Sequence, residues 1–401
     1  MNKIIPPNQC LSGPNYNGLV RFQFWRFGSW VMVIVDDRLP TRKGKLIYGQ
    51  SKDATEFWVA LIEKAYAKIH GCYEALEGGI TMDALVDLTG GLAERYELTD
   101  YDPALYKLMN RAHKSGAFIA CSRKGDWRSS TKADANGLIP GHAYTVIDIA
   151  QIKHKMGEEK LLRIRNPWGD ETEWRGSWSD GDNNWAWVDA ETKAKIQQES
   201  KDDGEFWMSF KDFYRQFGEV TICLMGPDFD GDGVSDRVGH MEMVRGEWVK
   251  GHNAGGSRNN LIKFATNHQY LLTVNEADDF NSDTSDWESE GKSAILVSLM
   301  QEHRRSRRNV KLTSHQIGFF IYKTDTPNKA LSLRHFRYHP DVGRTNCYVN
   351  FREVSGRFEL EPGKYVIIPT TFVEDCSAHY MIRVYGEKVF GLSGPLSQDQ
   401  V

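Results

Sequence analysis

A histidine and an asparagine, each at one end of a predicted strand, are the residues of this sequence best suited to chemistry. His142 begins the apolar run Ala-Tyr-Thr-Val, and Asn166 ends a second run immediately before Pro-Trp-Gly. A lone histidine is usually structural, and an asparagine before proline is usually a turn former. Together they suit nucleophilic catalysis, because an imidazole base needs a second group to hold it in one tautomer. Trp168, beside Asn166, would shield that hydrogen bond from water.

Carboxylates follow the asparagine and alternate with tryptophans. Glu173, Asp180, Asp203 and Glu205 flank Trp174, Trp178 and Trp207. Calcium in proteins takes six to eight oxygen ligands, mostly from carboxylates and backbone carbonyls. Acidic loops are more often simply solvated, so this pattern alone leaves both interpretations open.

The composition is that of an ordinary globular protein. The 401 residues carry a net charge of −4, with 26% charged and 40% hydrophobic residues. This balance gives no drive toward nucleic acid, and no apolar run is long enough to span a membrane or form a signal peptide. The cysteines are scattered singly, which favours free thiols in a reducing cytoplasm over a zinc site or disulfides; they are Cys10, Cys72, Cys121, Cys223, Cys347 and Cys376.

The elements that would position the candidate site are mixed helices and strands. A hairpin is expected over 19–35, turning at 27–29, followed by a helix capped by Ser51, Asp53 or Thr55 and stopped by Gly71. Further helices are expected at 82–88, at 103–114 with Asp102 or Thr99 as cap, and at 210–217. Strands are expected at 143–149, immediately after His142, and at 161–166, ending at Asn166.

The chain changes character near residue 227. A polar segment, Asp228 to Asp236, resembles part of an EF-hand loop but lacks its terminal glutamate, so it is either a calcium loop or a solvated linker. Beyond it, short alternating segments separated by Gly, Pro and Asp predict an antiparallel β-sandwich. These segments are 260–264, 269–274, 293–300, 317–322, 356–360, 365–369 and 380–385.

Local sequences carry a resemblance to a known family. They are Glu56-Phe-Trp58, Leu61 to Lys68, Gly71 to Leu76, Thr89-Gly-Gly91, Gly141-His-Ala-Tyr144, Arg165-Asn-Pro-Trp-Gly169 and Asp203 to Phe210, with Ala254-Gly-Gly256, Arg352 to Ser355 and Glu361 to Pro369 downstream. On these motifs the chain resembles the calpains, calcium-dependent cysteine proteases. The resemblance implies an α+β fold, with a papain-like protease core followed by a C2-like β-sandwich. It runs from about residue 4 to residue 389.

The resemblance implies a role for each site residue. His142 would be the general base, Asn166 its orienting partner and Trp168 the shielding tryptophan. Calcium would be the cofactor, bound by Glu173, Asp180, Asp203 and Glu205 together with the backbone carbonyl of Lys201. Glu56 matches one ligand of a second calcium site, whose other ligands have no counterpart in this sequence.

The family's nucleophile also has no counterpart here. It lies in a Gly-Asp-Cys-Trp segment upstream of sequence resembling residues 3–7, and that segment is absent from the 401 residues. We therefore expect the six cysteines to be structural, the chain to start after the catalytic cysteine, and the chain alone to be inactive. The hairpin and the helix after it should then expose an apolar face.

The resemblance also suggests a domain division. It comprises 1–79 as the remnant of a first core domain, 80–227 as the second core domain, 228–240 as an acidic linker, 241–390 as the C2-like domain and 391–401 as a tail. In the C2-like domain, a basic cluster would favour reversible contact with acidic phospholipid; it comprises Arg304, Arg305, Arg307 and Arg308.

Two functions remain open from the sequence. The first is calcium-dependent endoproteolysis of other cytoplasmic proteins, with an upstream segment supplying the thiol. The alternative is a non-catalytic, calcium-responsive relative that acts as a regulatory module binding proteins or membranes. The presence of His142, Asn166 and Trp168 together favours the first, because a pure binding role requires none of them.

Overall fold

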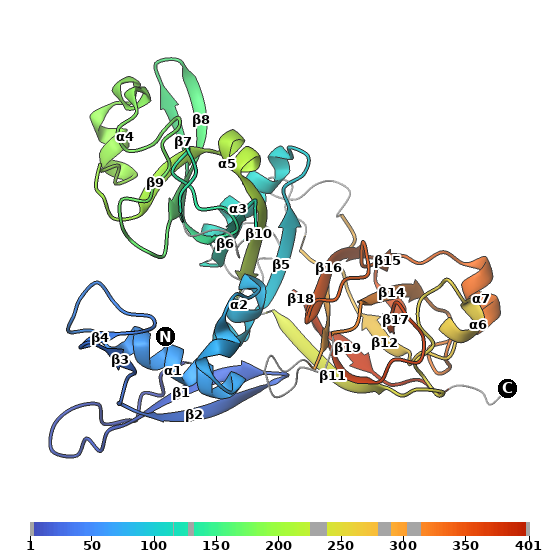
Figure 1. The fold of residues 1–401 in the computed structure, drawn as a ribbon. Helices are drawn as coiled ribbons and strands as arrows, with labels where there is room; N and C mark the ends of the chain where they lie inside the picture. The colour runs from blue at the N-terminus through green and yellow to red at the C-terminus, as the bar shows by residue number, and fades with distance from the viewer. Residues whose placement is uncertain are drawn as a thin grey trace.

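A computed structural model describes residues 4–114, 116–126, 132–224, 239–279, 290–302 and 314–397. Three regions meet around one central helix, α2, in the ribbon of Figure 1. A hairpin region lies at the amino-terminal end, a six-stranded region follows, and a two-sheet sandwich completes the chain. Among the described residues, no helix combines the length and the apolarity that crossing a bilayer would require.

The hairpin region is built from two long strands and one helix. β1 (Leu19–Arg26) pairs antiparallel with β2 (Ser29–Asp36) through the turn at Phe27 and Gly28, as expected. Alternate side chains of both strands face helix α1 (Trp58–His70) and form a small core with Ala65. The short strands β3 (Thr41–Arg42) and β4 (Lys45–Leu46) form a second hairpin.

The predicted cap of α1 is wrong. The Ser51 hydroxyl donates to Glu56, and Asp53 accepts from the amide and hydroxyl of Thr55, so these side chains close the preceding turn instead. The helix begins at Trp58 with no side-chain cap, and it ends at Gly71 as predicted. Gly71 has a φ of 108°, which glycine tolerates and other residues rarely adopt.

The six-stranded region holds the largest buried core. Its strand order is β5-β10-β6-β7-β8-β9, all antiparallel, so segments distant in sequence lie side by side. The core gathers the apolar sides of α3 and α5 with the inner sides of the strands. The elements are 3-10 helix η1 (Tyr73–Leu76), α2 (Thr81–Thr89), β5 (Leu92–Glu97), α3 (Pro103–Lys114), β6 (Phe118–Arg123), β7 (Ala143–His154), β8 (Gly157–Arg165), 3-10 helix η3 (Asn183–Trp187), α4 (Ala190–Lys195), β9 (Glu205–Ser209), α5 (Phe210–Gln216) and β10 (Phe217–Leu224).

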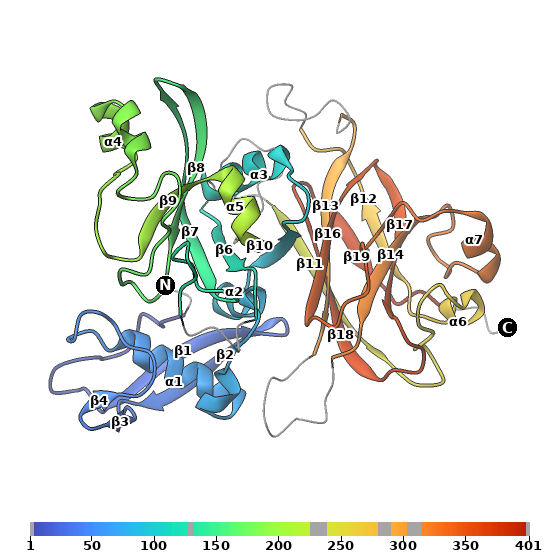
Figure 2. The same cartoon turned by 45° about the horizontal axis from the view of Figure 1, so that its top comes forward.

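The carboxy-terminal region is the expected sandwich. A four-stranded sheet, β11-β18-β13-β16, packs against a five-stranded sheet, β15-β14-β17-β12-β19, across a shared apolar core, as Figure 2 shows. The elements are β11 (His240–Trp248), α6 (Leu261–Phe264), β12 (Tyr270–Val274), β13 (Ser293–Gln301), β14 (Ile317–Lys323), α7 (Leu333–Tyr338), β15 (Gly343–Arg344), β16 (Glu353–Leu360), β17 (Gly363–Thr371), β18 (Ala378–Gly386) and β19 (Phe390–Ser393).

One predicted strand of the sandwich, 260–264, is a helix. The side chain of Asn260 accepts from the amide of Lys263 and caps the short helix α6. An asparagine that captures a nearby amide in this way favours a helix start over an extended chain. The basic cluster at Arg304, Arg305, Arg307 and Arg308 and the acidic segment from Asp228 to Asp236 lie outside the described residues.

Two arginines of the sandwich tie the three regions together. Arg352 bonds Asp87 of α2 at 2.7 Å and lies 3.3 Å from Asp83. Arg383 donates to the backbone carbonyl of Gly91 at 3.1 Å, just after α2, and its guanidinium lies 4.6 Å from the ring centre of Trp25 in β1. Both arginines are buried. The four-stranded sheet therefore contacts α2 and the hairpin directly.

The hairpin region exposes apolar side chains, as expected from the sequence. Met32 is 50% exposed and Ile34 is 41% exposed on β2, and Phe57 at the start of α1 is 50% exposed. Exposed apolar surface of this kind marks a place that another surface would cover. The six-stranded region shows no comparable run along any of its described strands.

Candidate active site

His142 lies immediately before β7 and is held by backbone bonds on both sides. Its carbonyl accepts from the amide of Arg123 at 2.9 Å, and its own amide donates to the carbonyl of Ile139 at 3.3 Å. The ring stands edge-on to Tyr144, with the ring centres 5.1 Å apart. The backbone of His142 is therefore anchored at the end of the β6–β7 ladder.

Asn166 follows β8 and is completely buried. Its side-chain oxygen accepts from Nε2 of His142 and from the amide of Trp168, both at 3.1 Å. Its side-chain nitrogen donates to the carbonyl of Thr172 at 3.1 Å, and its amide donates to the carbonyl of Gly204 at 2.8 Å. The bonds to Trp168 and Thr172 fix the side-chain amide and the bond to Gly204 fixes the backbone, so Asn166 can hold an imidazole in one orientation.

The geometry selects one tautomer of His142. Because the Asn166 oxygen is an acceptor, Nε2 carries the proton and Nδ1 is left as the basic nitrogen. Trp168 packs beside the imidazole with the ring centres 5.1 Å apart. Burial lowers the pKa of His142, and the bond from Asn166 opposes that shift. Burial therefore favours the neutral imidazole, with its proton on the nitrogen that faces Asn166.

None of the six cysteines bonds to His142 among the described residues. Cys121 and Cys223 are buried, and burial raises the pKa of the Cys223 thiol to about 11, which disfavours the reactive thiolate. The Cys10 and Cys376 thiols donate to the carbonyls of Ser12 and Val373. Cys72 is half-buried and Cys347 is exposed, so the expectation that all six cysteines are structural stays a prediction.

The predicted metal ligands lie on segments that the structure brings together. A carboxylate oxygen of Glu173 accepts from the amides of Asp203 at 3.1 Å and Gly204 at 2.7 Å. Asp180 accepts from the amide of Lys201 at 3.0 Å. Burial, followed by repulsion from Asp180 and Asp203, raises the pKa of Glu173 to about 7. Burial and the charge of Asp203 also raise the pKa of Asp180.

These carboxylates are not gathered as a finished metal site. Within the described parts of the chain, no three His, Cys, Asp or Glu side chains converge closely enough to hold an ion. Glu205 is engaged by two arginines, Arg163 and Arg165, each at 2.7 Å. Glu56 accepts from the Ser51 hydroxyl at 2.8 Å, away from the other predicted ligands. The donor chemistry fits a hard cation, while the geometry would need these side chains to move.

Sequence reasoning missed two residues that support Asn166. Gly204 supplies the carbonyl that bonds the Asn166 amide, and Thr172 supplies the carbonyl that bonds its side chain. Gly204 has a φ of 85°, and a Cβ there would lie 2.8 Å from the Cα of Gly169. The only sequence signal was the Asp-Gly pair at 203–204, which is typical of a tight turn.

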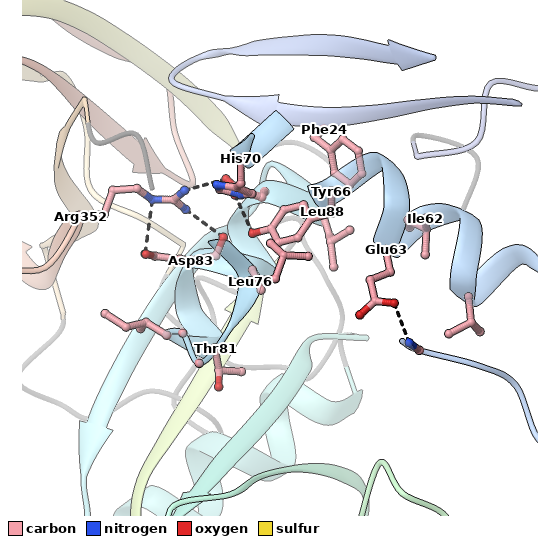
Figure 3. A pocket seen from close by; sticks show the side chains of 17 residues that line it. Phe24, Ile62, Glu63, Tyr66, His70, Leu76, Thr81, Asp83, Leu88 and Arg352 are labelled. Carbon is pink, nitrogen blue, oxygen red and sulfur yellow. Dashed lines mark hydrogen bonds and ion pairs between the residues drawn. The ribbon is translucent and has the colours of Figure 1, made fainter. Parts of the chain in front are cut away.

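An apolar pocket lies elsewhere, between α1, α2 and the sandwich. It has a volume of about 480 Å³, and neither His142 nor Asn166 lines it. Figure 3 shows Ile62 and Tyr66 of α1 facing Leu88 of α2 across it, with Arg352 and Asp83 at one end. A second pocket of about 620 Å³ lies beside Phe57 and Leu61. Two pockets therefore flank α1 in the hairpin region.

A histidine and an asparagine meet at the ends of neighbouring antiparallel strands, the arrangement expected of a papain-like protease core. Comparison with known families agrees. Residues 1–224 match the model of the calpain family cysteine protease, and residues 244–385 match that of calpain large subunit domain III. The chain belongs to the calpain family.

Individual relatives support this membership. The chain is 42% identical over 395 residues to Calpain-B of Drosophila melanogaster, a match covering 96% of this chain and 42% of that protein. It is 40% identical to the Calpain-2 catalytic subunit of Bos taurus and to human Calpain-9, covering 96% of this chain and 55% and 54% of those proteins. The chain thus spans about half the length of the curated relatives it matches.

Proposed function

We propose that this chain carries the general-base side of a calpain-type cysteine endopeptidase site. The bond between Nε2 of His142 and the Asn166 oxygen, at 3.1 Å, is the observation that supports it most directly. His142 would take the thiol proton through Nδ1, Asn166 would hold the tautomer, and Trp168 would exclude water from their bond. Proteins would be the substrates.

The thiol is proposed to come from outside the 401 residues. All six cysteines belong to the described residues, and no hydrogen bond there joins any of them to His142. The chain alone would then not hydrolyse peptides. The proposed domain division, with residues 1–79 as the remnant of a first core domain, is consistent with the hollow flanks of α1.

Calcium is the proposed cofactor. Glu173, Asp180 and Asp203 would hold the ion with the Lys201 carbonyl, and Glu205 would join once released from its arginines. A bound ion would supply positive charge that relieves the repulsion responsible for part of the raised pKa of Glu173. Since Glu173 bonds the Gly204 amide and Gly204 bonds Asn166, ordering these carboxylates would also order the partner of His142.

The test supplies the missing thiol. The catalytic-cysteine segment of the bovine Calpain-2 catalytic subunit is fused to the amino terminus, and turnover of a fluorogenic peptide is measured in calcium. We expect no turnover by the 401-residue chain, turnover by the fusion, and a loss of about 100-fold or more with His142→Ala or Asn166→Ala. The fusion with its cysteine changed to serine is the blank. Turnover by the unfused chain that survives His142→Ala would refute the proposal.

A regulatory, non-catalytic role is the competing outcome of the same experiment. It would be indicated if the fusion folds and binds calcium, yet shows no turnover above the blank in which its cysteine is changed to serine. A cytoplasmic location, and reversible contact of the sandwich with acidic phospholipid, complete the proposed function. The arginine cluster invoked for the lipid contact lies outside the described residues.

A further inference from the structure

The turn that precedes His142, residues 134–141, is anchored from both sides. On its inner side, the turn's own Leu138 and Ile139 are almost completely buried. On the outer side, the carbonyl of Asn136 accepts from the amide of Arg175 at 2.9 Å. A Cβ at Gly137 would lie only 1.8 Å from the carbonyl oxygen of Glu173, so the turn presses closely on that neighbouring segment. The turn is therefore packed tightly against the segment that carries Glu173.

Asp134 organises this turn with one carboxylate. Its Oδ1 accepts from the amides of Asn136 at 2.8 Å and Leu138 at 3.1 Å. Its own amide donates to the carbonyl of Leu138 at 2.8 Å, and its carbonyl accepts from the amide of Gly137 at 3.0 Å. The side chain thus does for the turn what a capping residue does for a helix.

Arg123 fastens Asp134 to the sheet. Its Nη2 bonds Oδ2 of Asp134 at 2.9 Å, and its Nη1 donates to the carbonyl of Gln216 at the end of α5. The Arg123 side chain is 13% exposed, so the pair is largely shielded from solvent. The backbone of the same residue bonds His142 and Gly141. Arg123 therefore holds both ends of the segment between Asp134 and His142.

The turn reaches the imidazole through Ile139 and Tyr144. The amide of Ile139 donates to the Tyr144 hydroxyl at 2.9 Å, and the carbonyl of Ile139 accepts from the amide of His142. Tyr144 is buried and stands edge-on to the His142 ring. A shift of the turn would therefore move the backbone of His142 and the aromatic wall beside its ring together.

We propose that Arg123 and Asp134 are positioning residues for His142, holding its imidazole in register with Asn166 through the turn between them. This inference rests on the proposed role of His142 as the base. The pair acts through the backbone, because the amide of Arg123 bonds the His142 carbonyl and the turn that Asp134 organises supplies the Ile139 carbonyl to the His142 amide. Neither residue would touch the substrate or the thiol.

The test observes the ring directly and needs no activity. The full chain is labelled with ¹⁵N-histidine, and the tautomer of His142 is measured by long-range imidazole NMR at neutral pH, with His142→Gln used to assign its signals. We expect mostly the Nε2–H tautomer in the parent. Asp134→Ala should produce a mixed tautomer population, because the turn loses the oxygen that accepts from two of its amides and also loses its anchor to Arg123.

Two further variants separate the contribution of the Arg123–Asp134 ion pair from that of the amides bonded to Asp134. Asp134→Asn keeps an oxygen for the two amides but loses the charge that pairs with Arg123, so it should lie between the parent and Asp134→Ala. Arg123→Met removes the anchor and leaves the turn, and it should also give an intermediate result. Should Asp134→Ala not fold, these two variants carry the test, and parent-like tautomers in both would overturn the inference.

The control removes an ion pair of similar burial far from the site. Asp341, 14% exposed and 3.1 Å from Arg258 in the sandwich, is changed to alanine and should leave the His142 tautomer unchanged. An unchanged tautomer in Asp134→Ala, or an equal change in Asp341→Ala, overturns the inference. If the proposed function fails, the fusion protein will be inactive in every form. The tautomer measurement will still show whether Arg123 and Asp134 position the His142 ring.

Discussion

The hairpin region and the six-stranded region differ in how they bury their apolar side chains. In the six-stranded region, helices α3 and α5 and the strands enclose one continuous core, and residues such as Phe213 and Met109 are fully buried. In the hairpin region, α1 covers only one face of two strands, pockets flank it, and Met32 and Phe57 are half-exposed. The six-stranded region is stabilised mainly by its own core, whereas the hairpin region depends more on contacts with neighbouring regions.

This difference bears on the chemistry. His142 and Asn166 belong to the region with the closed core, which explains why the dyad is already formed. The hairpin region is held mainly by contacts with α2 and the sandwich, through Asp87 and the arginines that bind around it. The hydrogen bonds that hold His142 and Asn166 thus all come from the six-stranded region itself.

The largest expected effect contrasts one phenylalanine from each region. Phe213→Ala should lower the free energy of unfolding by about 3–5 kcal/mol, because Phe213 is fully buried between Phe210 and Phe217. Phe57→Ala, at 50% exposure, should change it by about 0.5 kcal/mol or less. Urea unfolding followed by fluorescence would measure both. Equal costs would show that the hairpin region is as tightly packed as the other.

A smaller effect should come from the junction. Asp87 accepts from Arg352 at 2.7 Å, Arg26 at 3.0 Å and Tyr66 at 2.9 Å, and it is buried. Asp87→Asn should cost about 3 kcal/mol by leaving buried arginines without their counter-charge. Hydrogen exchange should show lost protection in β1 and α1 and unchanged protection in β7 and β8.

The matched control for the junction is an exposed ion pair. Lys153 and Glu158 lie 3.6 Å apart with both side chains exposed. Glu158→Gln should therefore leave hydrogen exchange in every region unaltered. If Asp87→Asn loosens β7 and β8 as much as β1, the two regions are not independent and the comparison fails.

The two regions should also respond oppositely to pH. The folded-state pKa of Glu173 is raised to about 7 from 4.5, so the folded chain holds a proton that the unfolded chain releases as pH rises between these values. The contribution of Glu173 to the free energy of unfolding is therefore present at acid pH and is lost as the pH rises through about 7. In the hairpin region, the bond from Lys64 lowers the pKa of Asp36, so its contribution is present at neutral pH and lost in acid.

Glu173→Gln tests this contrast. Glutamine can still accept the amides of Asp203 and Gly204, so the variant should be more stable than the parent at pH 7.5, by about 1 kcal/mol after allowing for solvent screening. At pH 4 the two should be equal. Urea unfolding without calcium gives the comparison, and Glu171→Gln, at an exposed position, is the control. Equal stability at both pH values would contradict the raised pKa.

The smallest effect concerns the exposed apolar face. Met32→Lys should change stability by about 0.5 kcal/mol or less, since Met32 is 50% exposed. It should reduce binding of an apolar fluorescent dye, because Met32 lies among other exposed apolar side chains of the hairpin region. Met156→Lys, at 73% exposure in the turn between β7 and β8, should leave dye binding unaltered. Similar losses from both would mean that the face is not a continuous patch.

Much of the fold could be predicted from the sequence because its signals are local. The hairpin at 19–36, Gly71 as a helix stop and Asp102 as the cap of α3 follow from turn and capping chemistry. Strand β11 was missed because its side chains alternate between exposed and half-buried, with charged residues at several positions. The sequence predicts a strand where the helix at 261–264 forms, because its apolar residues are too few to show a helical period.

The site could be predicted only in part, for a similar reason. His142 and Asn166 stand in distinctive local sequences, and their hydrogen bond confirms that the two residues meet. The roles assigned to them, and to the carboxylates, stay predictions. Gly204, Thr172 and Asp134 act through backbone contacts between segments distant in sequence, and no spacing rule in one chain reveals such contacts.

The contacts of Arg383 with Gly91 and Trp25 determine whether this chain can be expressed as separate fragments. The arginine is 1% exposed, pairs with Glu353 within its own sheet, and reaches across to the carbonyl of Gly91 and the ring of Trp25. A recombinant fragment cut between residues 224 and 239 would uncover Trp25, Cys223 and Met381 at once. Expression of either fragment alone should therefore give poorer yields than the whole chain, and co-expression of both should restore them.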